Sequence, residues 1–120
     1  MFKIFTKTAS IFLISISLFI APIYSNAAIA SYYGKGFHGK RTASGEIFNK
    51  WAMTTASNSH KMGTKLKVTN VVNGKSVIVK VNDRGGFSKY GRTLDLSRGA
   101  FAKIADIKQG LVKVKIKVLK

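Results

Sequence analysis

The stretch KLKVTNVVNGKSVIVKVNDRGG, residues 65–86, decides the fold of this chain. Leu66 and Val68 alternate with polar residues, Asn73-Gly74 follows, and the alternation resumes over residues 76–81. Strict apolar–polar alternation is typical of a half-buried strand. Asn-Gly suits a type I′ turn, because both central residues of that turn need a positive φ. The stretch therefore predicts a β-hairpin that turns at Asn73-Gly74, followed by a glycine-rich turn over 82–86.

Strand-like patterns also flank the hairpin. Short strands are predicted at residues 30–33, 51–56 and 93–96, and alternation with lysine predicts a last strand over 112–118. Ser97 is a favourable N-cap for a short helix that ends near Ile104. About six strands, one helix and no visible repeat or linker predict a single all-β domain over 28–120. A small closed barrel is the expected architecture, because closure removes exposed sheet edges.

The first 27 residues have the layout of a secretory signal peptide. Lys3 and Lys7 precede an apolar run over 11–21, and small residues at 25–27 offer a cleavage site. The run is about half of the roughly 20 residues that a membrane-spanning helix needs, which favours a cleaved signal peptide over the alternative of an uncleaved membrane anchor. We expect cleavage after Ala27 and a mature domain that is exported and not stably inserted in a membrane.

Charge is the strongest feature of the composition. The chain has 21 lysines and arginines against four acidic residues, a formal net charge of +17. Such a charge attracts polyanions, and the export signal favours anionic envelope polymers over nucleic acid as partners. The lysine face of the strand over 112–118 is a candidate surface for them, and a merely solvated face is the alternative. The absence of cysteine excludes disulfides and a lipid-modified cysteine.

The sequence lacks the motifs of the common metal, nucleotide-binding and serine-nucleophile sites. His38 and His60 have no paired-ligand spacing, so no metal site is predicted. The sequence has no GxSxG, no P-loop and no GxGxxG after a strand, and we expect no cofactor. Carboxylates remain as the candidates for chemistry.

The chain has four carboxylates: Glu46, Asp83, Asp95 and Asp106. We assign Asp106 to a turn after the helix. Cleavage of a glycosidic bond needs a carboxylic acid that protonates the leaving oxygen. A lytic transglycosylase can use one residue as acid and then as base, because the sugar's own 6-hydroxyl replaces water. The structural alternatives are a turn-forming Asp83 and a hydrogen-bonding Asp95, and we expect Arg84 either to point away from Asp83 or to bind a substrate carboxylate.

Four groups of motifs occur in order along nearly the whole of 28–120. They are Ala30-Ser31-Tyr32-Tyr33-Gly34 with Thr42-Ala43-Ser44-Gly45-Glu46, Gly63-Thr64 with the hairpin, Val81-Asn82-Asp83-Arg84-Gly85, and Gly91-Arg92 with Leu94-Asp95-Leu96-Ser97. Together they resemble the RlpA (rare lipoprotein A) family. The resemblance implies a six-stranded double-psi β-barrel. It also implies endolytic peptidoglycan transglycosylase activity, which prefers glycan strands without stem peptides and forms 1,6-anhydro ends.

The resemblance also implies site residues. The acidic residues of the family correspond to Glu46 and Asp83, and Asp95 matches an Asp-Leu-Ser element that expansin domains and another lytic transglycosylase family use. Asp83 and Glu46 are therefore the leading candidates for the acid and base, and Asp95 is the alternate or supporting carboxylate. The groove-lining candidates are Tyr33, His38, Thr42, Ser57 and Arg84, while Trp51 either stacks on a sugar or belongs to the core. The chain departs from the family at Ser57, where RlpA proteins often have a histidine, and His60 follows three residues later.

The resemblance also bears on where the protein acts in the cell and on an alternative function. RlpA proteins often have a lipid-anchoring cysteine and a C-terminal SPOR domain, and neither pattern is present here. We therefore expect a monomer that is free in the periplasm or secreted to the cell wall. Residues 99–104 also resemble the first domain of expansins, so a non-lytic wall-binding or wall-loosening module is the alternative. A cationic protein that only binds anionic surfaces is a third hypothesis.

Overall fold

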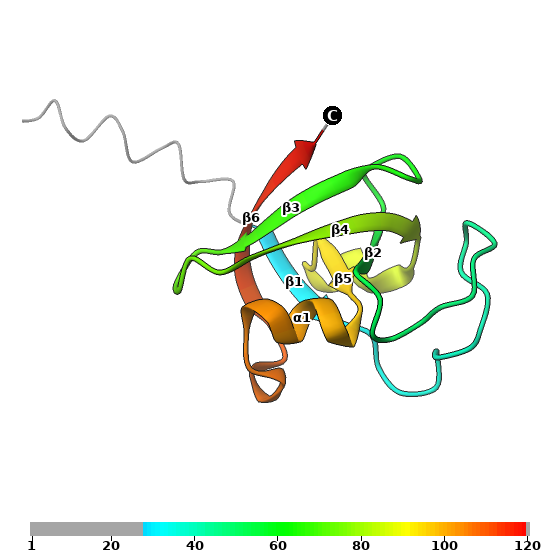
Figure 1. Cartoon of the computed structure of the whole chain (residues 1–120), viewed down its shortest axis with the longest axis horizontal. Coiled ribbons are helices and arrows are strands. Elements are labelled where there is room, and N and C mark those ends of the chain that lie inside the picture. The colour runs from blue at the N-terminus through cyan, green and yellow to red at the C-terminus, as the bar shows by residue number, and fades with distance from the viewer. Residues whose placement is uncertain (1–27, 120) are drawn as a thin grey trace, which may run out of the picture.

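The computed structural model describes residues 28–119, which form one closed barrel of six strands with a short helix (Figure 1). The strands are β1 (Ala28–Tyr32), β2 (Thr54–Ser57), β3 (Lys65–Asn70), β4 (Ser76–Asp83), β5 (Leu94–Leu96) and β6 (Val112–Leu119). The helix is α1 (Arg98–Ile104), and two 3-10 turns, η3 (Gly86–Tyr90) and η4 (Ile107–Gln109), flank β5 and α1. The predicted signal peptide, residues 1–27, lies outside the described residues. Within 28–119, no helix has the length and apolar character that crossing a membrane requires.

The barrel closes in the order β1-β5-β2-β4-β3-β6. Two neighbouring pairs, β1 with β5 and β2 with β4, are parallel, and the other four pairs are antiparallel. The prediction of a small all-β closed barrel with one helix is confirmed. Figure 1 shows the long strands β3, β4 and β6 along one side and the short strands β2 and β5 on the other.

The inside of the barrel is aliphatic because each strand turns alternate residues inward. Leu66 and Val68 of β3 and Val112 and Val114 of β6 are buried, whereas the lysines between them are exposed. Phe101 of α1 is fully buried in the same cluster. A buried phenylalanine side chain contributes about 1.5–3 kcal/mol to stability, so α1 is a structural part of the barrel.

The hairpin between β3 and β4 differs from its prediction at the turn. Thr69 pairs with Ser76, and the amide of Gly74 donates to the carbonyl of Asn70, so the loop is wider than a two-residue turn. The prediction of a two-residue type I′ turn at Asn73-Gly74 was therefore wrong, although the hairpin itself forms. The reason lies in α1: the side-chain amides of Asn70 and Asn73 both donate to the carbonyl of Ile104, at 2.7 and 3.0 Å. The wider loop thus brings both side chains to the carbonyl at the end of the helix.

The segment before β2 is attached tightly to the start of α1. Ser97 caps the helix by accepting from the amide of Ala100 at 3.0 Å, and its hydroxyl donates to the carbonyl of Ala52. The amide of Gly99 donates to the carbonyl of Lys50 at 2.8 Å. A Cβ at Gly99 would lie 2.7 Å from the carbonyl oxygen of Trp51, so only glycine permits this approach. Residues 50–52 are therefore held in a fixed position beside the helix.

Candidate active site

A row of four residues crosses the outer face of the barrel where the short strands lie. Ser31 of β1 pairs with Asp95 of β5, Asp95 pairs with Ala56 of β2, and Ala56 pairs with Asp83 of β4. Leu94 and Leu96, the neighbours of Asp95 in β5, point into the core. Asp95 and its direct partners on the adjacent strands therefore face outward. The Cα atoms of the two aspartates are two strand spacings apart, or roughly 10 Å.

A β-bulge places Asp83 in this row. Thr55 pairs with Val81, but the next residue, Ala56, pairs with Asp83, so Asn82 is an extra residue in β4. With regular pairing, Ala56 would face Asn82 and the aspartate would lie one position further along. Bulges redirect side chains in this way and are common beside active sites.

Asp83 is bonded by three donors. The hydroxyl of Tyr33 donates to Oδ2 at 2.7 Å, and the amides of Ala43 and Arg84 donate to Oδ1 at 2.8 and 2.9 Å. Asp83 is the acceptor in every contact, which is the arrangement of an ionised carboxylate. Burial, followed by the hydrogen bond to Asp83 and its charge, raises the pKa of the Tyr33 phenol well above its usual range, so Tyr33 keeps its proton and donates it.

The guanidinium of Arg84 points away from Asp83. Its Nη1 donates to the carbonyl oxygen of Ser57, and Glu46 with Lys80 is the one salt bridge among residues 28–119. Of the two arrangements expected for Arg84, the structure has the first. No arginine therefore pairs with the Asp83 carboxylate, which is half-buried.

Asp95 has a different environment, because it is largely buried on this face. The hydroxyl of Ser31 donates to its Oδ1 at 2.9 Å, and Nη1 of Arg92 lies 3.1 Å from that hydroxyl oxygen. Burial raises the pKa of the Asp95 carboxyl, and the charge of Asp83 adds to this, while Ser31 and Arg92 partly offset it. Asp95 therefore keeps its proton to a higher pH than an exposed aspartic acid.

Glu46 has an environment opposite to that of Asp95. It is exposed, Nζ of Lys80 lies 2.6 Å from its Oε2, and Nδ2 of Asn82 donates to its Oε1 at 3.0 Å. The bond to Lys80, followed by that to Asn82, lowers the pKa of Glu46. The amide of Ser44 also donates to the carbonyl of Asn82. Glu46 thus anchors the loop over 42–46 to the bulge, and this loop supplies the Ala43 amide to Asp83.

The remaining groove-lining candidates lie in several places. Nδ1 of His38 accepts from the amide of Lys50 at 3.1 Å, and the hydroxyl of Thr42 lies 2.9 Å from that of Ser44 within the turn before Glu46. Ser57 is fully buried at the end of β2, and its Oγ lies 2.9 Å from Nδ1 of His60. The structure therefore places an imidazole directly beside Ser57, the position where the family often has its histidine. Asp106 accepts from the amide of Lys108, which is the expected turn role.

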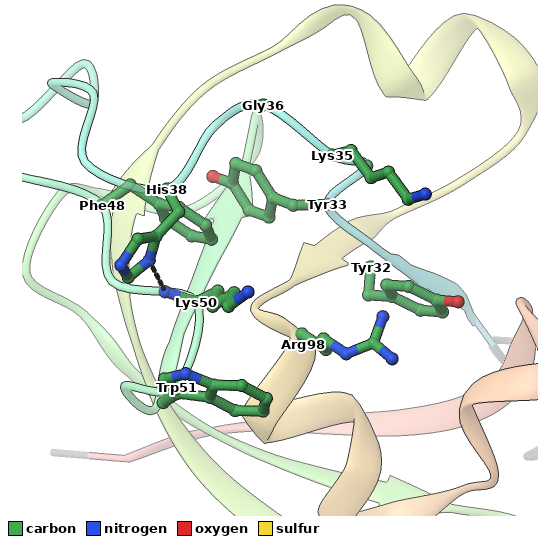
Figure 2. A pocket seen from close by; sticks show the side chains of 10 residues that line it. Tyr32, Tyr33, Lys35, Gly36, His38, Phe48, Lys50, Trp51 and Arg98 are labelled. Atoms are coloured by element: carbon green, nitrogen blue, oxygen red, sulfur yellow. Dashed lines mark hydrogen bonds between the residues drawn. The ribbon is translucent and has the colours of Figure 1, made fainter.

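A groove of about 670 Å³ adjoins the carboxylates (Figure 2). Tyr33 belongs to both: its hydroxyl bonds to Asp83, and its ring lines the groove and stacks on Phe48, with 4.1 Å between centroids. Trp51 lines the groove with a side chain that is 58% exposed, so it is outside the core. The other lining side chains include His38 and three cations, which are Lys35, Lys50 and Arg98.

Sequence reasoning missed Ser31, Arg92 and the three groove cations. Ser31 is 64 residues from Asp95, and only the parallel pairing of β1 with β5 brings them together. No local pattern shows that pairing. Among residues 28–119, no group of three His, Asp or Glu side chains is placed to hold a metal ion.

Comparison with known proteins agrees with this geometry. A family model described as lytic transglycolase, a double-psi β-barrel family, matches residues 25–116. A protein of Synechocystis sp. named "Probable endolytic peptidoglycan transglycosylase RlpA" is 50% identical over 76% of this chain and 28% of its own length. A Campylobacter jejuni protein named "Endolytic peptidoglycan transglycosylase RlpA" is 48% identical over 76% of this chain and 33% of its own length. The chain thus spans about a third or less of the length of these relatives.

Solved structures support the fold. A Clavibacter michiganensis expansin, solved as a mutant in complex with cellohexaose, superposes with a TM-score of 0.60 at 23% identity, over 78% of this chain and 50% of that one. The Streptomyces papain inhibitor superposes with a TM-score of 0.61 at 22% identity, over 78% and 93% of the two chains. The fold is that of the double-psi β-barrel class, as the motifs implied. Within that class, the chain belongs to the lytic transglycolase family.

Proposed function

We propose that this chain is an endolytic peptidoglycan transglycosylase, with Asp95 as the general acid and base and Asp83 as its ionised partner. The names of the relatives support the activity and substrate. The observation that carries the assignment is the contrast between two outward-facing aspartates in one row. Asp95 is largely buried and the pKa of its carboxyl is raised, which suits a proton donor, whereas Asp83 accepts every hydrogen bond that it makes, which suits a stabilising carboxylate.

The proposed reaction moves one proton in each direction. Asp95 donates its proton to the glycosidic oxygen between MurNAc and GlcNAc, and the bond from C1 of MurNAc to that oxygen breaks. The carboxylate of Asp83 stabilises the positive charge that develops at C1. The 6-hydroxyl oxygen of the same MurNAc bonds to C1, and its proton passes to the Asp95 carboxylate. The products are a 1,6-anhydro end and a new GlcNAc end, and Asp95 regains its proton.

Two residues have supporting roles in this proposal. Tyr33 fixes the orientation of Asp83 through its hydroxyl, and Glu46 fixes the loop that supplies the Ala43 amide. Glu46 was a leading candidate for the acid or base. Its pair with Lys80 favours a positioning role, because a carboxylate held ionised by a lysine is a poor proton donor.

The experiment uses the purified protein on peptide-stripped peptidoglycan and reads soluble products by mass spectrometry. We expect fragments with 1,6-anhydro ends from the native protein and from Glu46→Gln, and none from Asp95→Asn. Release that survives in Asp95→Asn and disappears in Glu46→Gln would reverse the two roles. Circular dichroism on each variant controls for folding.

A second candidate function is a non-lytic expansin-like module that binds or loosens the wall. The likeness to the expansin fold and the Asp95-Leu96-Ser97 element favour it. Sedimentation with intact sacculi distinguishes the two functions. Binding without any released sugar supports this candidate and contradicts the first.

We place either activity in the cell envelope and assign the lysine-rich wall of the barrel to anionic envelope polymers. Lys67 of β3 pairs with Lys117 of β6, and Lys65, Lys113 and Lys115 are exposed on the same strands. Their spacing along two adjacent strands suits a polymer with repeated negative charges. Export through residues 1–27 and a monomeric state remain predictions.

A further inference from the structure

Arg92 lies just before β5, and the stability of the fold does not explain its side chain. The side chain is half-buried, and its Nε is buried without a hydrogen-bond partner among residues 28–119. The one salt bridge in that part of the chain joins Glu46 and Lys80, so the charge of Arg92 has no acidic partner in direct contact. Burial of a charged donor without partners costs free energy. A role beyond stability is therefore the better explanation for an arginine here.

Arg92 is held in a defined position. The amide of the next residue, Thr93, donates to the carbonyl of Ile29 in β1 at 2.7 Å. Cζ of Arg92 lies 5.4 Å from the centroid of the Tyr90 ring. A cation–π contact of this kind orients a guanidinium without neutralising it. From this position Nη1 of Arg92 reaches Oγ of Ser31 at 3.1 Å.

The hydrogen bonds from Arg92 to Asp95 run in one direction. A guanidinium only donates, so Oγ of Ser31 accepts from Arg92. The single proton of the Ser31 hydroxyl is then left for Oδ1 of Asp95, at 2.9 Å. The carbonyl oxygen of Leu94 lies 3.5 Å from the same Oγ, which is beyond the usual range for a hydroxyl donor. Oδ1 of Asp95 is therefore an acceptor, and the proton of the neutral carboxyl is on Oδ2.

Oδ2 of Asp95 is also the oxygen that a substrate can reach. Among residues 28–119 it has no hydrogen-bond partner, and it does not belong to the buried side-chain atoms there that lack one, so it is exposed to solvent. A proton on Oδ1 would instead face Ser31. The bonds from Arg92 through Ser31 thus direct the acidic proton outward.

We propose that Arg92 is a positioning residue for Asp95, and that it acts through Ser31 to make Oδ2 the oxygen that both donates and recovers the proton. The inference rests on the proposed function, in which Asp95 protonates the glycosidic oxygen. In that step the bond between Oδ2 and hydrogen breaks, and the proton moves to the leaving oxygen. Oδ1 stays bonded to Ser31, so the lone pair on Oδ2 takes the proton of the 6-hydroxyl. One oxygen serves both steps, and the carboxyl does not rotate between them.

The charges around Asp95 give the inference a sign that can be measured. Burial raises the pKa of the Asp95 carboxyl, and the bond from Ser31 and the charge of Arg92 partly offset this. The charge of Asp83 raises the same pKa, and the Tyr33 phenol on this face keeps its proton. Loss of Arg92 from an intact fold therefore raises the pKa of Asp95. A fold that opened would expose the carboxyl and lower its pKa toward the ordinary value.

The test compares Arg92→Ala with Lys89→Gln as the matched control. Nζ of Lys89 lies 5.6 Å from the centroid of the Tyr90 ring, so both variants remove a cation beside the same ring. Among residues 28–119, only Arg92 bridges that ring and Ser31. The rate of anhydro-product release is measured as a function of pH, and the pKa of Asp95 is measured by carbon-13 NMR in each variant.

We expect Arg92→Ala to lower the rate about tenfold, because a proton donor that is not oriented loses efficiency. The pKa of Asp95 rises in this variant, so the loss of activity at high pH moves to a higher pH. Ser31→Ala lowers the rate to a similar extent, and adding Arg92→Ala to it causes no further loss, because Arg92 acts through Ser31. Lys89→Gln changes neither the rate nor the pKa.

A groove beside Arg92 allows chemical rescue as a second measurement. The groove has a volume of about 340 Å³, and Ser88 and Thr93 are among the residues that line it with Arg92. In Arg92→Ala, added methylguanidinium can enter the space that the side chain leaves. We expect millimolar methylguanidinium to restore part of the rate of Arg92→Ala and to leave Ser31→Ala unchanged.

Three results would overturn the inference. They are an Asp95 pKa that stays or falls in Arg92→Ala, additive rate losses in the double variant, and a loss in Lys89→Gln as large as that in Arg92→Ala. Circular dichroism on each variant controls for folding.

The two readouts also separate this inference from the proposed function. A raised Asp95 pKa in Arg92→Ala, with no anhydro products from the native protein, contradicts the transglycosylase and supports the chain of hydrogen bonds. Anhydro products from the native protein, with an unchanged Asp95 pKa in Arg92→Ala, contradict the positioning role and leave the transglycosylase in place.

Discussion

The wall of β3 and β6 and the wall of β1, β5 and β2 both alternate inward and outward residues, but their outward residues differ in charge and burial. The wall of β3 and β6 has five exposed lysines on its outer face, which are Lys65, Lys67, Lys113, Lys115 and Lys117. On the wall of β1, β5 and β2, Phe48 of the loop after β1 and Phe87 of η3 pack with Ala56, so that Ser31 and Ala56 are buried and Asp95 is half-buried. Alternation shows which residues face outward, but it does not show which of them are buried by other segments. That burial affects the pKa of an ionisable side chain.

The carboxylates show the consequence of that cover. Asp95 lies on the covered wall, where burial raises the pKa of its carboxyl, whereas Glu46 is exposed and its bond to Lys80 lowers its pKa. The two residues have similar intrinsic acidity, so the environment separates them. The covered wall can therefore donate a proton at a pH where the open side of the molecule cannot.

The largest expected effect is on catalysis at the covered wall. Asp95→Asn is expected to lower the rate of anhydro-product release about a thousandfold, because it removes a proton donor that contributes roughly 10²–10⁴-fold in comparable sites. Glu46→Gln is the matched change in the uncovered carboxyl, and we expect it to alter the rate only a few-fold. Comparable losses in both variants would erase the distinction between the two environments.

A smaller effect is expected on the segment that fixes the groove beside the covered wall. Gly99→Ala places a Cβ against the carbonyl of Trp51 and is expected to lower the free energy of unfolding by about 1–3 kcal/mol, as overpacking does. Gly34→Ala is the control, since nothing lies within 4 Å of a Cβ there. Urea denaturation measures both variants. Equal stability of the two would show that the segment over 50–52 is not held as described.

The stability of the covered wall is also expected to depend on pH. The pKa of Asp95 is raised in the folded protein, so between its ordinary value of 3.8 and the raised value the folded state binds more protons than the unfolded state. Stability therefore falls as the pH rises through this range. Asp95→Asn removes the cost of ionising a buried carboxyl, so we expect it to raise the melting temperature at pH 7 and to have no such effect below pH 3.8. A variant that is less stable at pH 7 would contradict this.

The smallest effect on stability is expected on the open wall. Replacing Lys67, Lys115 and Lys117 with glutamine is expected to change the free energy of unfolding by no more than about 0.5 kcal/mol at each position, because these side chains are exposed. Binding to an anionic polymer such as teichoic acid should weaken and lose much of its salt dependence. Unchanged binding in co-sedimentation would assign the wall to solubility alone.

The open wall and the core could be predicted from sequence because their signals are local. Alternation in β3, β4 and β6 and the cap at Ser97 depend on neighbouring residues, and the strands and helix occur close to where they were expected. The prediction of the hairpin turn was wrong because Asn73 bonds to Ile104, a partner 31 residues away. Local propensity does not contain that contact.

The candidate site was predictable as a set of residues and not as an arrangement. Asp83, Asp95 and Tyr33 were identified from motifs, but the bulge at Asn82 and the pairing of Ser31 with Asp95 arise only when the barrel closes. The direction of Arg84 and the pair between Glu46 and Lys80 depend on the same closure. These long-range contacts determine which carboxyl holds a proton, and so the division of roles required the structure.

The most direct test of the central claim is a carbon-13 NMR titration of the side-chain carboxyls in the native protein. The signals of Asp95 and Glu46 are assigned with Asp95→Asn and Glu46→Gln. We predict that Asp95 titrates above its ordinary value of 3.8 and that Glu46 titrates below its ordinary value of 4.5. An Asp95 carboxyl that titrates at or below 3.8 would contradict the account, because the covered wall would then hold no acid that is better able to donate a proton than any exposed one.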